Sequence, residues 1–314
     1  MSELKENNIP WVEKYRPQTT KDLIGFEKIT NKLKKFLDEF FILQSKYRNL
    51  RKEIKITKIS GNLELLKKKK LQLKSFQLKM IRQKAILLIG PAGVGKTSIA
   101  YALANDYNMS VIELNSSDIR TEDAIQSKLQ ETVKTTNLLS FTKKKTRGKL
   151  ILIDEVDGLH GQSDRGGVKA LLNIIAISKF PLILTCNFRD KKLKGIFDLI
   201  ESINVTKASP KDVSIVLRKI SKLEDIDISD EQINHLALES NGDYRSSIND
   251  LQALTQSSHS IDEDTLANIN IKRDSETEIQ VFMNKMFATH KIKDAKKTFG
   301  MMADRMRRLA AMKP

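Results

Sequence analysis

The residues from Gly90 to Thr97 read Gly-Pro-Ala-Gly-Val-Gly-Lys-Thr and join an apolar run to a helix-period stretch. This spacing is typical of a phosphate-binding loop, because its glycines let successive backbone N–H groups surround phosphate oxygens at a helix start. Lys96 is predicted to reach the β- and γ-phosphates of a nucleotide, and Thr97 to ligate Mg²⁺. The loop residues predicted to bind the nucleotide are Gly90, Pro91, Ala92, Gly93, Val94, Gly95, Lys96, Thr97 and Ser98.

Carboxylates follow a second apolar run. Leu150–Ile153 leads directly into Asp154 and Glu155. Asp154 is predicted to hold the Mg²⁺ shell together with Thr97, while Glu155 orients or deprotonates the attacking water. A purely structural role is disfavoured, since carboxylates are rarely buried without a partner. The two segments together predict binding and hydrolysis of ATP.

Two further polar residues give weaker signals. Asn187 follows the run Leu182–Thr185 and is predicted to face the γ-phosphate, although an asparagine after a strand is also a common turn residue. Arg245 is predicted to swing onto the γ-phosphate, and its alternative is a surface pair with Asp243 or Asp250. The residues predicted to act in catalysis are Lys96, Glu155, Asn187 and Arg245.

The elements that must position these residues alternate from Ala85 onward. Short runs rich in Ile, Leu and Val alternate with helix-period stretches, which predicts an α/β core with a doubly wound parallel sheet flanked by helices. The predicted strands are 85–89, 110–114, 150–153, 182–185 and 203–206. The predicted helices between them are 96–107, 122–134, 167–177 and 193–200.

After Thr206 the pattern is helical. Helices are predicted over 210–222, 229–241 and 244–257, with Pro210 and Ser229 as typical start residues. We expect a nucleotide-binding core over 1–207 and a small all-helical lid domain over 208–271. Another helix-period stretch, 276–290, lies in a segment, 272–314, interpreted as a partial C-terminal helical collar or tail.

The positive charge is concentrated in one segment. Residues 42–84 contain 14 lysines and arginines against two glutamates, so they carry +12 of the net charge of +16. Two long helices, 31–59 and 63–84, are predicted there, broken by a Ser-Gly-Asn turn into a projecting basic hairpin insertion. A solvated pair of charged helices and an arm that touches DNA both fit this pattern, and the sequence assigns it no role.

Length and composition exclude several classes. A chain of 314 residues exceeds what one compact core usually holds, so more than one folding unit is expected. Its single cysteine, Cys186, excludes an intrachain disulfide and a cysteine-based zinc site. No apolar run approaches the ~18 residues of a membrane span, and Met1–Asn8 lacks the pattern of a secretory signal. We therefore expect a cytoplasmic protein without a membrane partner.

Four motifs in this order resemble the AAA+ clamp loaders of the replication factor C family. They are Trp11-Val-Glu-Lys-Tyr-Arg-Pro17, the phosphate loop, Asp154-Glu-Val-Asp157 and Gly242-Asp-Tyr-Arg245, and the resemblance runs from about Pro10 to Asn270. It implies ATP and Mg²⁺ as cofactors, and it places Tyr15, Arg16 and Pro17 against the adenine. The tracts 154–161 and 164–172 look more like the family's large subunits than its small ones.

The resemblance also implies partners. A large subunit works in a hetero-oligomer with small clamp-loader subunits and loads the sliding clamp onto primer-template DNA, which it contacts without regard to sequence. Arg120, Arg165 and Lys169 are the candidate DNA contacts, because they lie at or near predicted helix starts after core strands.

An absence along the chain favours the large-subunit comparison. Small subunits carry a Ser-Arg-Cys motif before the last core strand, whereas no arginine occurs here between Arg189 and Arg218. The chain is therefore expected to lend no arginine to a neighbour's ATP site, and to hydrolyse ATP poorly without partners.

Two features depart from the family pattern, namely the long basic insertion and the end at Pro314, before a complete collar and clamp-binding tail. The alternatives are another AAA+ DNA-processing ATPase, such as an origin-binding initiator or a helicase loader, and a scaffold that binds nucleotide without hydrolysing it.

Overall fold

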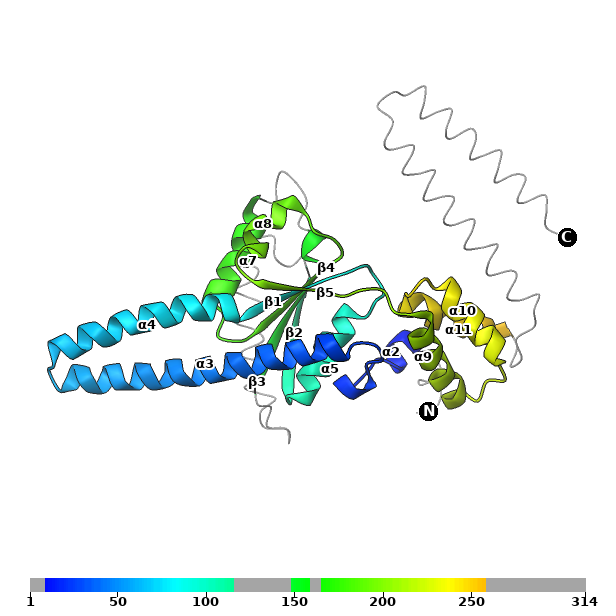
Figure 1. The fold of residues 1–314 in the computed structure, drawn as a ribbon, viewed down its shortest axis with the longest axis horizontal. Helices are drawn as coiled ribbons and strands as arrows, with labels where there is room; N and C mark the ends of the chain where they lie inside the picture. Colours follow the sequence, from blue (N-terminus) through cyan, green and yellow to red (C-terminus); the bar gives the residue numbers. More distant parts are fainter. Residues whose placement is uncertain (1–8, 116–147, 159–164, 258–314) are drawn as a thin grey trace, which may run out of the picture.

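A computed structural model describes residues 9–115, 148–158 and 165–257 of the chain. Its centre is a five-stranded sheet in the order β2-β3-β4-β1-β5, and every neighbouring pair is parallel (Figure 1). The prediction of a parallel sheet flanked by helices is confirmed. The strands are β1 (Ala85–Ile89), β2 (Met109–Asn115), β3 (Gly148–Asp154), β4 (Leu182–Cys186) and β5 (Glu201–Asn204).

Helices cover both faces of the sheet. Alternate residues of each strand point to opposite faces, so each strand contributes to two cores. On one face Leu87 of β1 packs in a core with Leu171 and Ile175 of α7 (Arg165–Ile177). On the other face Leu88 shares a core with Leu33 of α3 (Glu27–Ile59) and with α5 (Lys96–Asp106). Continuous apolar strands are the expected result of this double cover.

The region before β5 differs from the expectation. Where one helix was predicted over 193–200, a 3-10 turn, η5 (Lys191–Leu193), runs into the short α8 (Lys194–Phe197). β5 begins two residues earlier than predicted, because Ile86 of β1 pairs with Glu201. As an edge strand, β5 tolerates polar exposed residues at positions that the apolar pattern did not favour. The predicted helices at 122–134 and 276–290 lie outside the described ranges.

The basic segment forms the predicted helical hairpin. It consists of the outer part of α3 and of α4 (Leu63–Gln83), which project together from the sheet (Figure 1). The turn between them contains Gly61 at φ 72°, and the Asn62 side chain caps α4 by accepting from the Leu65 backbone N–H at 3.0 Å. The base of α3 is anchored in the core through Leu33 and Leu37, whereas α4 buries none of its residues.

Three helices form the lid: α9 (Pro210–Leu223), α10 (Asp230–Glu239) and α11 (Tyr244–Ser257). Leu217, Leu236 and Leu251, one from each helix, belong to one buried cluster. The short α2 (Trp11–Lys14) packs on it, and the Trp11 backbone N–H donates to Gln252 Oε1 at 3.0 Å. The boundaries at 207 and 271 remain predictions, and the collar segment 272–314 lies outside the described residues.

Within those same ranges, no helix has the length and apolar character needed to cross a membrane.

Candidate nucleotide site

The phosphate loop connects the end of β1 to the start of α5, at the carboxyl edge of the sheet. Gly93 and Gly95 have φ values of 72° and 93°, which side chains rarely tolerate. A Cβ at Gly90 would lie 2.1 Å from the carbonyl oxygen of Val205. Glycine is therefore required at these positions by backbone conformation or by close approach.

Lys96 is buried inside this loop, with 7% of its surface exposed. Its Nζ donates to the carbonyl oxygens of Gly90 at 2.7 Å and Pro91 at 2.8 Å, and to Asn187 Oδ1 at 3.0 Å. Burial lowers the pKa of Lys96, and the negative charge of Asp154 opposes that shift. The ammonium group thus lies inside the loop and close to carboxylates. Its hydrogen bonds go to neutral oxygen atoms, which phosphate oxygens could replace.

Asp154 is fixed at the end of β3 by two hydroxyl groups. The Thr97 hydroxyl donates to Asp154 Oδ2 at 2.9 Å, and the Thr185 hydroxyl donates to Oδ1. Hydroxyl and carboxylate oxygens are ligands that Mg²⁺ accepts. No cluster of three or more acidic, His or Cys side chains able to hold a metal occurs in the described part of the chain. The pair fits Mg²⁺, which usually takes one or two protein ligands beside phosphate and water oxygens.

Glu155 has a left-handed backbone conformation at φ 53°, and it lines the cavity into which the phosphate loop opens. Its backbone N–H donates to Thr185 Oγ1 at 3.1 Å and to Asp154 Oδ1 at 3.2 Å. Such conformations in non-glycine residues are uncommon and concentrate at functional sites. The neighbouring hydroxyl and carboxylate therefore hold the backbone that carries the predicted base.

Asn187 lies beside the phosphate loop, and its role toward the γ-phosphate stays a prediction. Its side chain accepts from Lys96, and its backbone N–H donates to Asp157 Oδ2 at 3.1 Å. Asp157 is buried, and by accepting this hydrogen bond it fixes the turn that follows β4. Neither Thr185 nor Asp157 was among the residues predicted for the site. The alternation of β4 was the signal for Thr185, since its side chain must point to the face opposite Leu184.

The loop opens into a cavity of about 500 Å³ between the core and the lid. This volume lies in the range of small-molecule sites. Tyr15 and Pro17 line it together with Ile220, Leu223 and Ile248 of the lid, and Tyr15 packs against the buried cluster of the lid. These apolar side chains form a surface suited to a planar base. The Tyr15 hydroxyl donates to Glu224 Oε1 at 2.5 Å, and burial raises the pKa of Tyr15.

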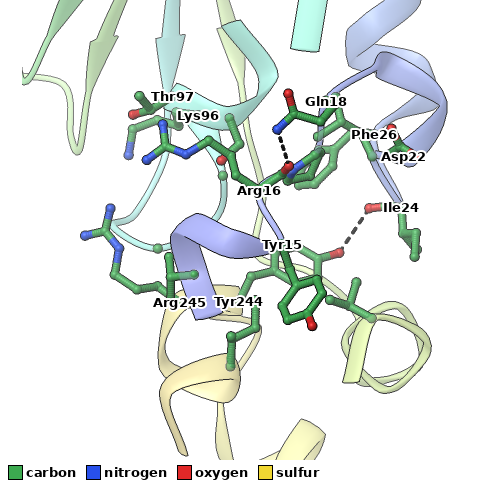
Figure 2. A pocket seen from close by; sticks show the side chains of 18 of the residues that line it. Tyr15, Arg16, Gln18, Asp22, Ile24, Phe26, Lys96, Thr97, Tyr244 and Arg245 are labelled. Carbon is green, nitrogen blue, oxygen red and sulfur yellow. Dashed lines mark hydrogen bonds between the residues drawn. The ribbon is translucent and has the colours of Figure 1, made fainter. Parts of the chain in front are cut away.

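Arg16 points in a different direction from Tyr15. Its side chain extends toward Lys96 and Thr97 (Figure 2), and its guanidinium lies 5.3 Å from the ring centroid of Tyr101. Nη2 donates to Glu13 Oε1 at 2.5 Å, whereas the buried Nε finds no hydrogen-bond partner among the residues that the structure describes. The three residues predicted to lie against the adenine therefore do not point the same way. Arg16 faces the phosphate loop, whereas Tyr15 and Pro17 line the apolar part of the cavity.

The first turn of the lid helix α11 touches the phosphate loop, a contact that sequence reasoning missed. The Tyr244 backbone N–H donates to the Gly93 carbonyl at 3.2 Å. The Tyr244 hydroxyl donates to the Ile24 carbonyl at 3.0 Å, and its ring lies 6.0 Å from that of Phe26. Arg245 is exposed on the cavity wall (Figure 2).

Of the three candidate DNA residues, only the side chain of Lys169 is described, and it does not line this cavity. Arg120 lies outside the described residues, and Arg165 begins α7 with a side chain that is not described. Lys169 is exposed one turn further along α7. Their contact with DNA stays a prediction.

The chain is similar in sequence to several known proteins. The family model described as "ATPase family associated with various cellular activities (AAA)" matches residues 86–205. A replication factor C large subunit of Thermofilum pendens is 33% identical over 283 residues, covering 90% of this chain and 58% of the relative. That of Nanoarchaeum equitans is 40% identical over 222 residues, covering 70% and 50%.

A Holliday junction branch migration motor, RuvB of Thermotoga maritima, is similar in structure at 17% identity. Its TM-score is 0.46, and the match covers 81% of this chain and 71% of that one. The chain spans about half the length of the curated relatives it matches. The sequence matches thus place an AAA ATPase domain at residues 86–205, in a chain that is similar over most of its length to replication factor C large subunits.

Proposed function

We propose that the cavity binds ATP with Mg²⁺ and hydrolyses it. The observation that carries this proposal is the convergence of Lys96, Asn187 and the Thr97–Asp154 pair at one edge of the sheet. Bound Mg²⁺ would neutralise negative charge on the phosphates, held by Thr97 and Asp154. Lys96 would exchange its loop carbonyls for phosphate oxygens, which makes the same hydrogen bonds stronger by adding charge.

The remaining residues act on water and on the lid. Glu155 accepts a proton from the attacking water or orients it, while Asn187 fixes its position. Arg245 lies across the cavity on the lid, where attraction to the γ-phosphate would draw the two parts of the chain together. Nucleotide state is thereby converted into the angle between core and lid.

We further propose that the chain supplies the ATPase and lid of a clamp-loader large subunit. The relatives named replication factor C large subunit support this, since they are 33% and 40% identical over 90% and 70% of this chain. Its partners would be small clamp-loader subunits, the sliding clamp and primer-template DNA held through the backbone. Between Arg189 and Arg218 no arginine occurs to donate to a neighbour, so this subunit would sit at the end of an open arc.

The catalytic part is tested with Glu155→Gln in a complex reconstituted with small subunits. ATP binding should be retained, while the turnover number falls by about 10²–10⁴-fold, the usual contribution of a general base. Glu201→Gln on the exposed edge strand makes the same chemical change away from the cavity and should leave turnover intact. Equal rates for Glu155→Gln and wild type would overturn the assignment of Glu155.

The assembly part is tested by co-purification of the full chain with small clamp-loader subunits and the clamp. We expect a stable complex whose ATPase activity is stimulated by primed DNA. Failure to co-purify with either partner, with ATP binding intact, would reject the clamp-loader role and leave the nucleotide site standing.

A further inference from the structure

We propose that the groove between the helical hairpin and the end of α7 binds the phosphate backbone of duplex DNA. The groove encloses about 760 Å³ and is lined by residues from α3, α4 and the segment after α7. Among the described residues, five basic side chains and no acidic side chain line it. They are Arg48, Arg51, Lys74, Lys84 and Lys179. This inference does not rest on the proposed ATPase, because β1 separates the groove from the phosphate loop.

The base of the groove is built rather than incidental. Lys84 is 4% exposed, and its Nζ donates to the carbonyl oxygens of Ala176 at 2.8 Å and Ser178 at 2.9 Å, at the end of α7. Gln44 Nε2 donates to the Lys179 carbonyl at 3.0 Å from the other helix. These three bonds fix both helices of the hairpin to the core, so the groove has a defined width.

The two helices are also joined to each other at the groove. Gln77 Nε2 of α4 donates to the Tyr47 hydroxyl of α3 at 3.2 Å. The Arg51 guanidinium lies 5.8 Å from the Tyr47 ring centroid, which holds the charged group over the groove floor. Arg48 Nη2 donates to Gln44 Oε1 at 3.0 Å and keeps its remaining donors available.

The hairpin's own carboxylates do not neutralise these cations. Glu53 pairs with Lys69 at 3.1 Å, and it lies about half a turn around α3 from Arg51, at ~100° per residue. Glu64 lies at the tip, in the first turn of α4. The basic side chains of the groove can therefore neutralise phosphates and release their counterions, because no carboxylate among the described residues of the hairpin competes for them.

Helical spacing extends the cationic surface outward from the groove. Lys55 and Lys58 lie seven and ten residues beyond Arg48 on the same face of α3, while Lys70 and Lys67 continue the face of Lys74 on α4. The ten residues from Arg48 to Lys58 span about 15 Å, which is the rise of roughly four to five base pairs. Two parallel rows of exposed cations at this length match a duplex backbone better than a compact anion.

The test uses the full chain with Arg48→Gln, Arg51→Gln and Lys74→Gln combined. Fluorescence anisotropy with a labelled DNA duplex, repeated over a series of salt concentrations, measures affinity and its salt dependence. We expect affinity to fall at least tenfold at low salt. The slope of log K against log salt should become shallower by about 2 to 3, since each lost phosphate contact removes ~0.9.

A matched variant removes the same charge outside the groove: Lys46→Gln, Lys68→Gln and Lys79→Gln, all exposed and none in the lining. This triple variant should keep the wild-type slope and most of the affinity. Equal losses in both triple variants, or no loss in the groove variant, would overturn the proposal. So would unchanged DNA affinity with lost binding to poly-glutamate, which would assign the groove to an acidic polypeptide instead.

Binding of a fluorescent ATP analogue distinguishes this test from the proposed ATPase. All the variants should bind the analogue as the wild type does, because the substituted residues lie at the far end of β1 from the phosphate loop. Thermal unfolding should be equally unaffected, since the six side chains are exposed. A groove variant that lost ATP binding or melted early would contradict the separation of the two sites.

Discussion

Two buried lysines flank β1, one at each end, and they invite comparison. Lys84 precedes the strand and Lys96 follows its phosphate loop, with 4% and 7% of their surfaces exposed. Both ammonium groups donate to backbone carbonyl oxygens at 2.7–2.9 Å. Burial lowers the pKa of both side chains. By burial and hydrogen bonding alone the two residues are nearly alike.

Their electrostatic surroundings differ. Near Lys96 stand Asp154, Asp157 and Glu155, whose negative charges favour its protonated form. Near Lys84 burial acts alone, and its two partners are carbonyls at the carboxyl end of α7, where a helix favours a cation. Burial of a lysine is therefore no sign of a ligand site by itself. The sign is a set of opposing charges in a cavity that a ligand can reorganise.

The largest expected effect separates the two lysines by ligand binding. Lys96→Met should raise the dissociation constant for ATP by about 100-fold or more, because charge-assisted hydrogen bonds contribute ~1.5–3 kcal/mol each. Lys84→Met, which makes the same chemical change at the other end of β1, should leave ATP binding unchanged. Calorimetric titration of both variants measures the difference. If both variants lost affinity alike, the contrast between the two ends of β1 would be wrong.

The second prediction separates them by pH. Burial lowers the pKa of Lys84 to about 8 from its ordinary value of 10.5. Between these values the unfolded chain binds more protons than the folded chain, so stability should rise with pH. The rise should be on the order of 2–3 kcal/mol. It should be absent below pH 8, where Lys84 is protonated in both states.

Urea unfolding of wild type and Lys84→Met, measured from pH 7 to pH 10, isolates the contribution of this one group. The difference in unfolding free energy between the two proteins should change with pH in this window. A constant difference would mean that Lys84 keeps an ordinary pKa despite its burial.

The comparison also explains what the sequence was able to predict. The sheet and the lid were predictable because apolar periodicity follows directly from which faces are buried, as in the continuous run Ala85–Ile89. The phosphate loop was predictable because backbone geometry demands glycine at Gly93 and Gly95, and the acidic strand because carboxylates directly follow the apolar run Leu150–Ile153. The hairpin was predictable because the Ser60–Asn62 turn separates two long helical stretches.

Contacts between distant segments were not predictable, since no local pattern encodes them. The hydrogen bond from Tyr244 to Gly93 joins residues about 150 positions apart. The same holds for the hydroxyl of Thr185 on Asp154 and for Arg16 beside Tyr101 on α5. The resemblance to a family placed Tyr15, Arg16 and Pro17 together against a base, whereas the backbone sends the side chain of Arg16 toward the loop.

The third prediction uses that division. Arg16→Ala should weaken binding of ATP about tenfold and leave binding of adenosine nearly unchanged, because the guanidinium faces the loop and a charge-assisted bond contributes ~1.5 kcal/mol. Tyr15→Ala should weaken both ligands by similar factors, since its ring lines the apolar side of the cavity. Competition with a fluorescent ATP analogue measures all four constants. An equal loss of affinity for both ligands in Arg16→Ala would mean that Arg16 contacts the adenine base.

The smallest effect concerns a carboxylate that the lid brings to the loop end of β1. An alanine Cβ at Gly93 would lie 2.0 Å from Asp243 Oδ1, so this charge sits against the phosphate loop. Asp243 also caps α11, because the Ser246 backbone N–H donates to its Oδ1 at 2.8 Å. Asp243→Asn keeps the cap and removes the charge that opposes phosphate, so ATP affinity should rise about threefold to fivefold at low salt.

Calorimetry at low and high salt checks this gain, which screening should reduce as ionic strength increases. Glu239→Gln on the exposed surface of α10 removes the same charge from the lid and should give no gain. Weaker ATP binding in Asp243→Asn would show that the carboxylate assists the nucleotide. In that case the loop end of β1 would tolerate acids near phosphate, and the contrast between the two ends would rest on Lys96 alone.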